Sequence, residues 1–231
     1  MTNRKRSKYN HNLKLYHEPT YKGFKLKRSN APYIEPHLDG LYATMISALN
    51  HHHRTLAVRF DLKVPLSGIP IEVDNPVKRF IDAVRARINR HLKQKFKREG
   101  RFRSCRLRYA VKVEQKVMAL HEHYHVILFV NNDVFRCIKN LGPNDDSALG
   151  KMIRDSWHSV VKLDERSTEV LIHSSPTPNR HLTGDVSSDN PVMRAAFEHY
   201  SYICKEDTTL YRMNRPSFYS SSKLAKNKAP A

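Results

Sequence analysis

The chain contains 231 residues, 39% of them apolar, which is enough to build a substantial core in one large domain or two small ones. Lysine and arginine total 41 against 22 aspartate and glutamate residues, and the formal net charge of +19 favours a polyanionic partner. There is no run of about 18 apolar residues and no basic helix with a clean apolar face, so we expect nucleic acid rather than a membrane as partner. Neither a signal peptide nor a Cys-x-x-Cys pair is visible, which favours the reducing cytoplasm.

The two ends of the chain lack a sustained apolar period. The first 28 residues hold nine lysines and arginines against one acid, Glu18. Residues 1–34 are therefore predicted to be a flexible basic arm that contacts phosphates, with a solvated tail of no function as the alternative. Residues 35–222 are predicted to form the folded domain, and residues 223–231 a disordered tail.

The folded part is expected to begin with a helix, a strand and a second helix. Apolar residues at helical spacing predict the first helix over residues 35–54. Strict alternation in "TLAVRFDLKVP", residues 55–65, predicts a strand with one buried face. Asp74 or Asn75 is a candidate N-cap of a long basic helix that ends at Gly100. The expected core positions of the two helices are Leu41, Met45, Leu49, Phe80, Val84, Ile88 and Leu92.

The second half of the chain predicts a hairpin followed by alternating helices and strands. Residues 104–115 and 121–131 both alternate and are separated by a short connection, which indicates an antiparallel hairpin. The remaining expected elements are a helix over 147–163, a short strand over 168–175, a loop over 176–190 and a helix over 191–206. Strands separated by helices, with a central hairpin, predict an α+β fold in which an antiparallel sheet is backed by helices.

The segment "HEHYHVILFVN", residues 121–131, opens with three histidines at alternating positions. Because side chains alternate along a strand, His121, His123 and His125 should point the same way, about 7 Å apart for each step of two. Two such imidazoles can bind one divalent metal ion, and Mg²⁺ or Mn²⁺ is accepted where oxygen ligands complete the shell. Without further ligands, the pattern is more often the polar face of a half-exposed strand.

A carboxylate at the end of the preceding strand supplies the missing ligand type. In an antiparallel hairpin Glu114 would lie beside His123 and His125, whereas Glu122 would point to the opposite face of its strand. The alternative for Glu114 is an exposed carboxylate at a strand end.

The segment "YICK" in the last predicted helix carries a candidate nucleophile. Tyr202 and Lys205 are three residues apart and should share a helix face, with His199 one turn earlier on the same side. A tyrosine beside a metal-bound phosphate can act as a nucleophile if a nearby ammonium stabilises the phenolate. A buried tyrosine with a lysine that reaches to solvent is the structural alternative.

Three blocks, "RFDLKVP", "HYHVILFVN" and "YICK", occur in the order of motifs one, two and three of the HUH endonucleases, which the chain resembles over roughly residues 40 to 222. Within that superfamily the chain is most similar to the inovirus-type replication proteins that include the YagK/YfjJ C-terminal domain family. The resemblance implies a ferredoxin-like or RRM-like central antiparallel sheet flanked by helices, the HUH endonuclease fold.

The resemblance also implies residue roles and an activity. His123 and His125 would be metal ligands with Glu114 as the third, Tyr202 the nucleophile and Lys205 its helper, with Mg²⁺ or Mn²⁺ as cofactor. The family's reaction nicks single-stranded DNA at a replication origin, leaves a 5′-phosphotyrosine bond and a free 3′-hydroxyl for rolling-circle synthesis, and is reversed by religation. Origin DNA is thus the expected partner, in the cytoplasm of a bacterial host, and a host helicase and polymerase are candidate partners.

The chain departs from the family's pattern at Cys204, where relatives usually carry alanine, and at Thr209, where they tend to have lysine. Tyr200 is two residues from Tyr202 and should point elsewhere, so a single acting tyrosine is expected. Two other functions stay open. One is a DNA-binding regulator on an HUH scaffold that does not cut, and the other is a small transposase or relaxase of the same superfamily.

Overall fold

The computed structural model describes residues 5–65, 74–115, 122–142, 144–162, 171–211 and 215–222. The expectations for His121 and for the tail over 223–231 lie outside the described residues.

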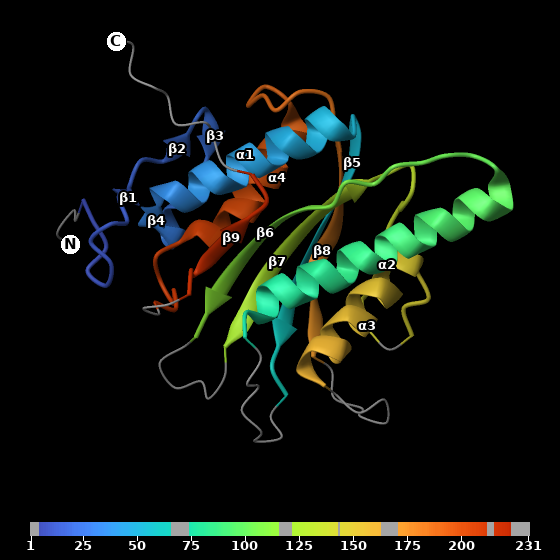
Figure 1. The fold of residues 1–231 in the computed structure, drawn as a ribbon. Coiled ribbons are helices and arrows are strands. Elements are labelled where there is room, and N and C mark those ends of the chain that lie inside the picture. The colour runs from blue at the N-terminus through green and yellow to red at the C-terminus, as the bar shows by residue number, and fades with distance from the viewer. Residues whose placement is uncertain are drawn as a thin grey trace, which may run out of the picture.

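A five-stranded sheet forms the centre of the fold, with the strand order β8-β5-β7-β6-β9 (Figure 1). Each pair of neighbouring strands in this sheet is antiparallel. The predicted hairpin is confirmed, because β6 and β7 are neighbours with Glu114 opposite His123. The strands are β5 (Arg54–Lys63), β6 (Arg108–Glu114), β7 (His123–Asn131), β8 (Ile172–Thr183) and β9 (Phe218–Ser220).

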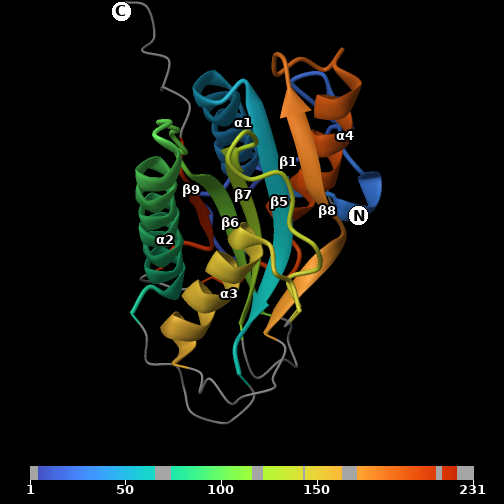
Figure 2. The same cartoon turned by 90° about the vertical axis from the view of Figure 1, so that its right-hand side faces the viewer.

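Helices cover both faces of this sheet, as Figure 2 shows. The helices α2 (Pro76–Glu99) and α3 (Ala148–Val161) pack on one face, where the core includes Leu56, Val58, Phe60 and Leu62 of β5. The helices α1 (Glu35–His51) and α4 (Pro191–Tyr200) pack on the other face, over Ala57, Ile127 and Phe129. The α+β prediction is therefore confirmed. Both faces of β5 contribute to a core, whereas the sequence predicted only one buried face.

The predicted helix caps of α2 are also confirmed. Asn75 accepts a hydrogen bond from the backbone N–H of Lys78 at 3.1 Å, and Gly100 follows the helix with a φ of 65°. The predicted core positions of the two helices are confirmed. Buried are Leu41, Met45, Leu49, Phe80, Val84 and Ile88, and Leu92 is partly buried against the core that contains Phe80. Among the described residues, no helix is long and apolar enough to cross a membrane.

The prediction of a flexible arm over residues 1–34 is wrong for the described part of that segment. Residues 15–34 form short antiparallel pairs and pack on the face covered by α1 and α4. Phe24 is 1% exposed, and its ring lies 4.7 Å from that of Phe197 in α4. The apolar residues sit in strands of two residues, which are too short to produce a period in the sequence. These elements are β1 (Leu15–Tyr16), β2 (Thr20–Tyr21), β3 (Phe24–Lys25), η1 (Arg28–Asn30) and β4 (Tyr33–Ile34).

Two boundaries near the C-terminus also differ from the prediction. β8 continues to Thr183 through residues expected in a loop, because it is an edge strand with a break in register that tolerates two prolines in the sequence. The last α-helix ends at Tyr200, and a 3₁₀ turn, η2 (Ser201–Cys204), follows it. Val192, Ala196 and Ile203 form a stripe in the sequence that predicts docking of this helix on the sheet; Ala196 and Ile203 are buried, but Val192 is 40% exposed.

Candidate active site

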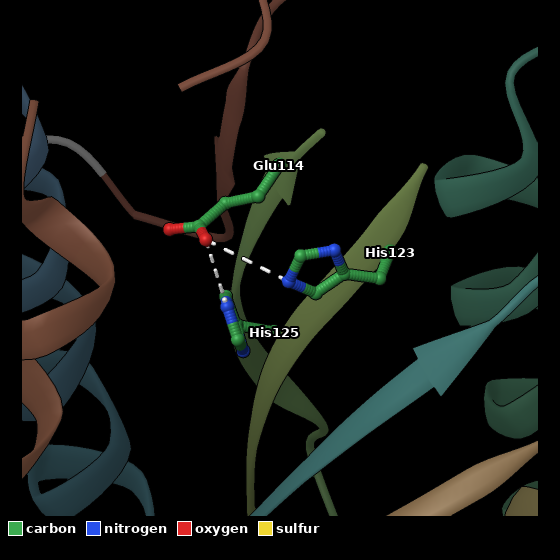
Figure 3. Close-up of side chains that lie close together, drawn as sticks. All are labelled: Glu114, His123 and His125. Atoms are coloured by element: carbon green, nitrogen blue, oxygen red, sulfur yellow. Dashed lines mark ion pairs between the residues drawn. The ribbon is translucent and has the colours of Figure 1, made fainter. Parts of the chain in front are cut away.

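Glu114, His123 and His125 converge at one end of the sheet, on the face covered by α1 and α4. Glu114 ends β6, and the two histidines lie at alternating positions of the neighbouring β7. Figure 3 shows one oxygen of the glutamate carboxylate facing both imidazoles. Its Oε2 atom is 3.6 Å from Nε2 of His123 and 3.2 Å from Nε2 of His125. The predicted trio therefore forms a compact set of three ligand atoms, all within 4.8 Å of one another.

Asp61 orients the second histidine from the other side. It lies opposite His125 in the ladder between β5 and β7, and its Oδ1 is 2.6 Å from Nδ1 of the imidazole. A proton on Nδ1 is held by this contact, so the lone pair of Nε2 is directed toward Glu114. A carboxylate behind a histidine is the usual way in which proteins fix the tautomer of a metal ligand.

The trio has the features required to hold a divalent metal ion. Glu114 is 2% exposed and His125 5% exposed, yet Oε1 of the former and Nε2 of the latter have no hydrogen-bond partner among the described residues. Buried polar atoms without partners are costly, and a bound cation would satisfy both. Two imidazole nitrogens and a carboxylate suit Mn²⁺, Mg²⁺ and several transition ions, so the ligand set alone does not select the metal.

The charges in this cluster are shaped by burial and by mutual attraction. Burial would raise the pKa of Glu114, but interactions with His125, the Thr208 hydroxyl and Lys205 lower that pKa to about 2. Burial would lower the pKa of His125, but Asp61 and Glu114 raise it. The carboxylate is therefore ionised across the physiological range and available as a ligand.

Tyr202 and Lys205 meet beside the trio. Nζ of Lys205 donates a hydrogen bond to the phenolic oxygen of Tyr202 at 2.8 Å and lies 3.9 Å from Oε1 of Glu114. The rings of Tyr202 and His125 are 5.5 Å apart in an edge-to-face arrangement. The residues were expected on one α-helix, but Tyr202 lies in the 3₁₀ turn and Lys205 directly follows it. A 3₁₀ turn also aligns positions three apart, so the predicted pairing is retained.

Arg59 supports the tyrosine ring from the sheet. Its guanidinium carbon lies 5.0 Å from the centre of the Tyr202 ring, and Nη1 is 3.1 Å from Nε2 of His199. Burial and the neighbouring Arg59 lower the pKa of His199 to about 4, so this imidazole is neutral near pH 7 and can accept from the guanidinium. His199 therefore reaches the site through Arg59.

Lys112 is a buried cation that the sequence analysis missed. It lies opposite His125 on β6, is 0% exposed, and its pKa is lowered to about 8 by burial. Nζ donates to the backbone oxygen of Lys205 at 2.9 Å and to Oγ1 of Thr209 at 2.5 Å. It thereby anchors the segment that carries the Lys205 side chain. The alternating pattern of the strand predicts that a lysine at this position faces solvent, so it does not indicate a buried anchoring role.

Tyr200 is excluded from the site by its position. It is 0% exposed, packs against Phe129 with ring centres 6.1 Å apart, and burial raises its pKa. The expectation that Tyr200 and Tyr202 point in different directions is confirmed. Glu122 likewise accepts from the Tyr124 hydroxyl at 3.1 Å and is not part of the trio, as predicted.

The structure brings together all five residues singled out from the sequence: Glu114, His123, His125, Tyr202 and Lys205. It adds Asp61, Arg59 and Lys112, which lie on the same face of the three central strands. In the sequence these three residues alternate with apolar neighbours, which indicates that each lies on the polar face of its strand. Only the strand register shows that this is the face that carries the histidines.

The fold and the cluster define an α+β protein with a two-histidine, one-carboxylate group that could hold a metal ion. The profile of the YagK/YfjJ C-terminal domain family matches residues 16–221, and the chain belongs to this family. The match begins inside the N-terminal segment, which is therefore part of the family's domain. No curated protein and no solved structure shows significant similarity to the chain.

Proposed function

We propose that the protein is a rolling-circle replication initiator that nicks and religates single-stranded DNA at an origin through Tyr202. One observation carries the proposal: Nζ of Lys205 lies 2.8 Å from the Tyr202 hydroxyl. The same ammonium group is 3.9 Å from Oε1 of Glu114. A nucleophile, a cation and a metal-ligand set thus share one small volume. We further propose that the sheet is the ferredoxin-like core of an HUH endonuclease, since the first two motifs occur on β5 and β7 and the third follows the last helix in a 3₁₀ turn.

In the proposed reaction, each residue of the site has a separate role. Lys205 stabilises the Tyr202 phenolate, and Arg59 holds the ring by its face. The phenolate oxygen attacks the scissile phosphorus, a 5′-phosphotyrosine bond forms, and the 3′ oxygen leaves and takes a proton to become a hydroxyl. A divalent ion bound by Glu114, His123 and His125 would polarise the phosphoryl group and offset its developing charge. Religation is the same transfer in reverse, so the cut needs no nucleotide.

The overall charge supports a nucleic-acid substrate. The formal net charge is +19, and α2 presents a basic outer face beside the sheet. Phosphate contacts of this kind position a strand without reading its sequence.

The test uses labelled single-stranded fragments of the DNA that flanks the gene, incubated with the protein and Mn²⁺ or Mg²⁺. The expected product is a covalent protein–DNA adduct that resists denaturation and maps to Tyr202 by mass spectrometry, together with a fragment whose 3′ end a polymerase can extend. Tyr202→Phe should abolish the adduct, whereas Tyr200→Phe, which removes a buried hydroxyl without a described partner, should retain it. An adduct that persists in Tyr202→Phe would overturn the nucleophile assignment.

A DNA-binding regulator would give a different result in the same experiment. It would bind the fragments in a salt-dependent manner, without response to EDTA and without a nicked product. That outcome would replace the enzymatic proposal.

A further inference from the structure

A basic cavity lies at the end of the sheet opposite the candidate active site. It has a volume of about 850 Å³, within the range of ligand-binding pockets. β5 runs from Arg54, which lines the cavity, to Asp61, which contacts His125. These residues are seven apart on a strand, or about 23 Å, so the cavity is separate from the trio. The lining residues are Arg54, Arg101, Phe102, Arg103, Asn131, Asn132, Asp133, Arg136, His181 and Thr183.

The lining is strongly positive. It contains four arginines and a single carboxylate, Asp133, which pairs with Arg54 at 3.0 Å. Arg103 is 3.9 Å from Glu99. Within the described residues, Arg101 and Arg136 have no ion-pair partner within 4.0 Å. Two guanidinium groups are therefore available for phosphate, which they match in a bidentate geometry.

An aromatic side chain stands among these cations. Phe102 is 79% exposed, the highest value among the exposed large apolar residues of the described chain. An exposed phenylalanine gains nothing from packing and offers a flat face on which a base can stack. Duplex DNA keeps its base faces stacked inside, so only unpaired nucleotides can use this surface.

Two amides that line the cavity, Asn131 and Asn132, are already engaged in hydrogen bonds or close polar contacts. Asn131 accepts from the backbone of Asp133 at 2.8 Å and donates to the carbonyl of Ser104 at 2.8 Å. Oδ1 of Asn132 is 2.8 Å from Nδ1 of His181. Because these two amides are engaged within the protein, they are less able to read a base edge, so binding there should depend little on sequence.

We propose that this cavity is a second binding site for single-stranded nucleic acid, in which Arg101 and Arg136 contact phosphates and Phe102 stacks on an unpaired base. The inference goes beyond strand cutting and does not depend on it. A strand held here lies at the end of the sheet opposite Tyr202.

The test measures binding of labelled oligothymidylate in EDTA, with the full chain carrying Tyr202→Phe, so that no cutting can contribute. Phe102→Ala should weaken binding by roughly 5- to 100-fold, the effect of losing one stacked base. Phe96→Ala is the matched control, because Phe96 is 49% exposed and does not line the cavity. Equal affinities of the two alanine variants would overturn the proposal.

The arginines are tested by the salt dependence of the same binding. Arg101→Ala with Arg136→Ala should reduce the slope of log K against log salt by about 1.4, since each lost phosphate contact accounts for roughly 0.7 in a single strand. Lys25→Ala with Lys151→Ala removes the same charge from exposed positions on β3 and α3, outside the cavity and off the basic face of α2. An equal change in both double variants would mean that only bulk charge acts, which contradicts a built site.

Photo-crosslinking identifies the site and the nucleic acid that uses it. Oligonucleotides with 5-bromouracil, in deoxyribose and ribose forms, should crosslink to a peptide that contains Phe102. The form with the higher yield identifies DNA or RNA as the ligand. Crosslinks confined to peptides around Tyr202 would overturn the second site, and this result is independent of whether the protein nicks DNA.

Discussion

Asp61 and His125 face each other across neighbouring strands, with Oδ1 of the carboxylate 2.6 Å from Nδ1 of the imidazole. This contact turns Nε2 toward Glu114 and fixes the orientation of an imidazole in the group that could hold a metal ion. The candidate ligands on β6 and β7 are thus supported by a side chain from the next strand of the same sheet, β5.

Asp61→Asn is expected to weaken metal binding by about 10- to 100-fold. The amide can donate to Nδ1, which would shift the proton of His125 to Nε2 and block the lone pair that faces Glu114. Titration with Mn²⁺, followed by calorimetry, measures the affinity. Asp82→Asn, at a carboxylate on the outer face of α2, is the control and should bind normally. Equal affinities of the two variants would show that Asp61 does not orient the ligand.

Metal binding should stabilise the fold, because the ligands are assembled only in the folded state. Mn²⁺ at one hundred times its dissociation constant would add about 2.7 kcal/mol to the free energy of unfolding, and EDTA would remove it. Glu114→Gln should abolish this gain, as measured by thermal denaturation with and without the ion. Glu122→Gln changes a neighbouring carboxylate that directly precedes β7 and contacts Tyr124, and it should keep the gain. A metal effect that survives Glu114→Gln would place the ion elsewhere.

Lys205→Met should slow adduct formation by about 10²-fold, since the Tyr202 phenolate loses the cation 2.8 Å from its oxygen. Binding of single-stranded DNA in EDTA should change far less than the rate. Single-turnover kinetics with saturating protein separate the two effects. Lys151→Met, on the exposed side of α3, removes the same charge and should leave the rate unaltered. A loss confined to binding would reduce Lys205 to a phosphate contact.

Phe24→Ala should lower the free energy of unfolding by about 3–5 kcal/mol, because the side chain is 1% exposed and packs against Phe197. Urea denaturation followed by circular dichroism gives the value. Phe102→Ala removes an exposed ring and should change stability by no more than about 0.5 kcal/mol. A negligible effect of Phe24→Ala would restore the interpretation of the N-terminal segment as a loose arm.

Acid should destabilise the protein through the buried His37. Burial lowers the pKa of His37 well below 6.5, and its ring stacks on Phe218 at 4.5 Å. Because the unfolded chain binds the proton more readily, this contribution to stability is complete above about pH 6.5 and declines as the pH falls toward the folded-state pKa. The loss is up to about 1.4 kcal/mol per pH unit for one such group.

Urea denaturation at pH 7 and pH 5 measures this dependence. His37→Leu, which cannot titrate, should lose less stability between the two pH values than the unaltered chain. His53→Leu, at an exposed position, should follow the unaltered chain. If His37→Leu shows the full pH dependence, the buried imidazole is not its source.

The sequence by itself determined the elements that obey a period or a cap. Alternation defined β5, β6 and β7 and placed His123 and His125 on one side, and Asn75 and Gly100 marked the ends of α2. These signals are local, since each depends on residues within one turn or one strand. The order of the motifs indicated Tyr202 and Lys205 as a functional pair. Their side chains stay adjacent whether the turn is α-helical or 3₁₀.

Only the tertiary structure decided which residues from different strands meet. The register that pairs Glu114 with His123 also aligns Asp61 and Lys112 on either side of His125, and a slip of one residue would move each of them to the other face. The packing of residues 15–34 and the extension of β8 along the sheet edge likewise depend on partners far away in the chain. Buried charges such as Lys112 are favourable only because the fold supplies acceptors that no local pattern reveals.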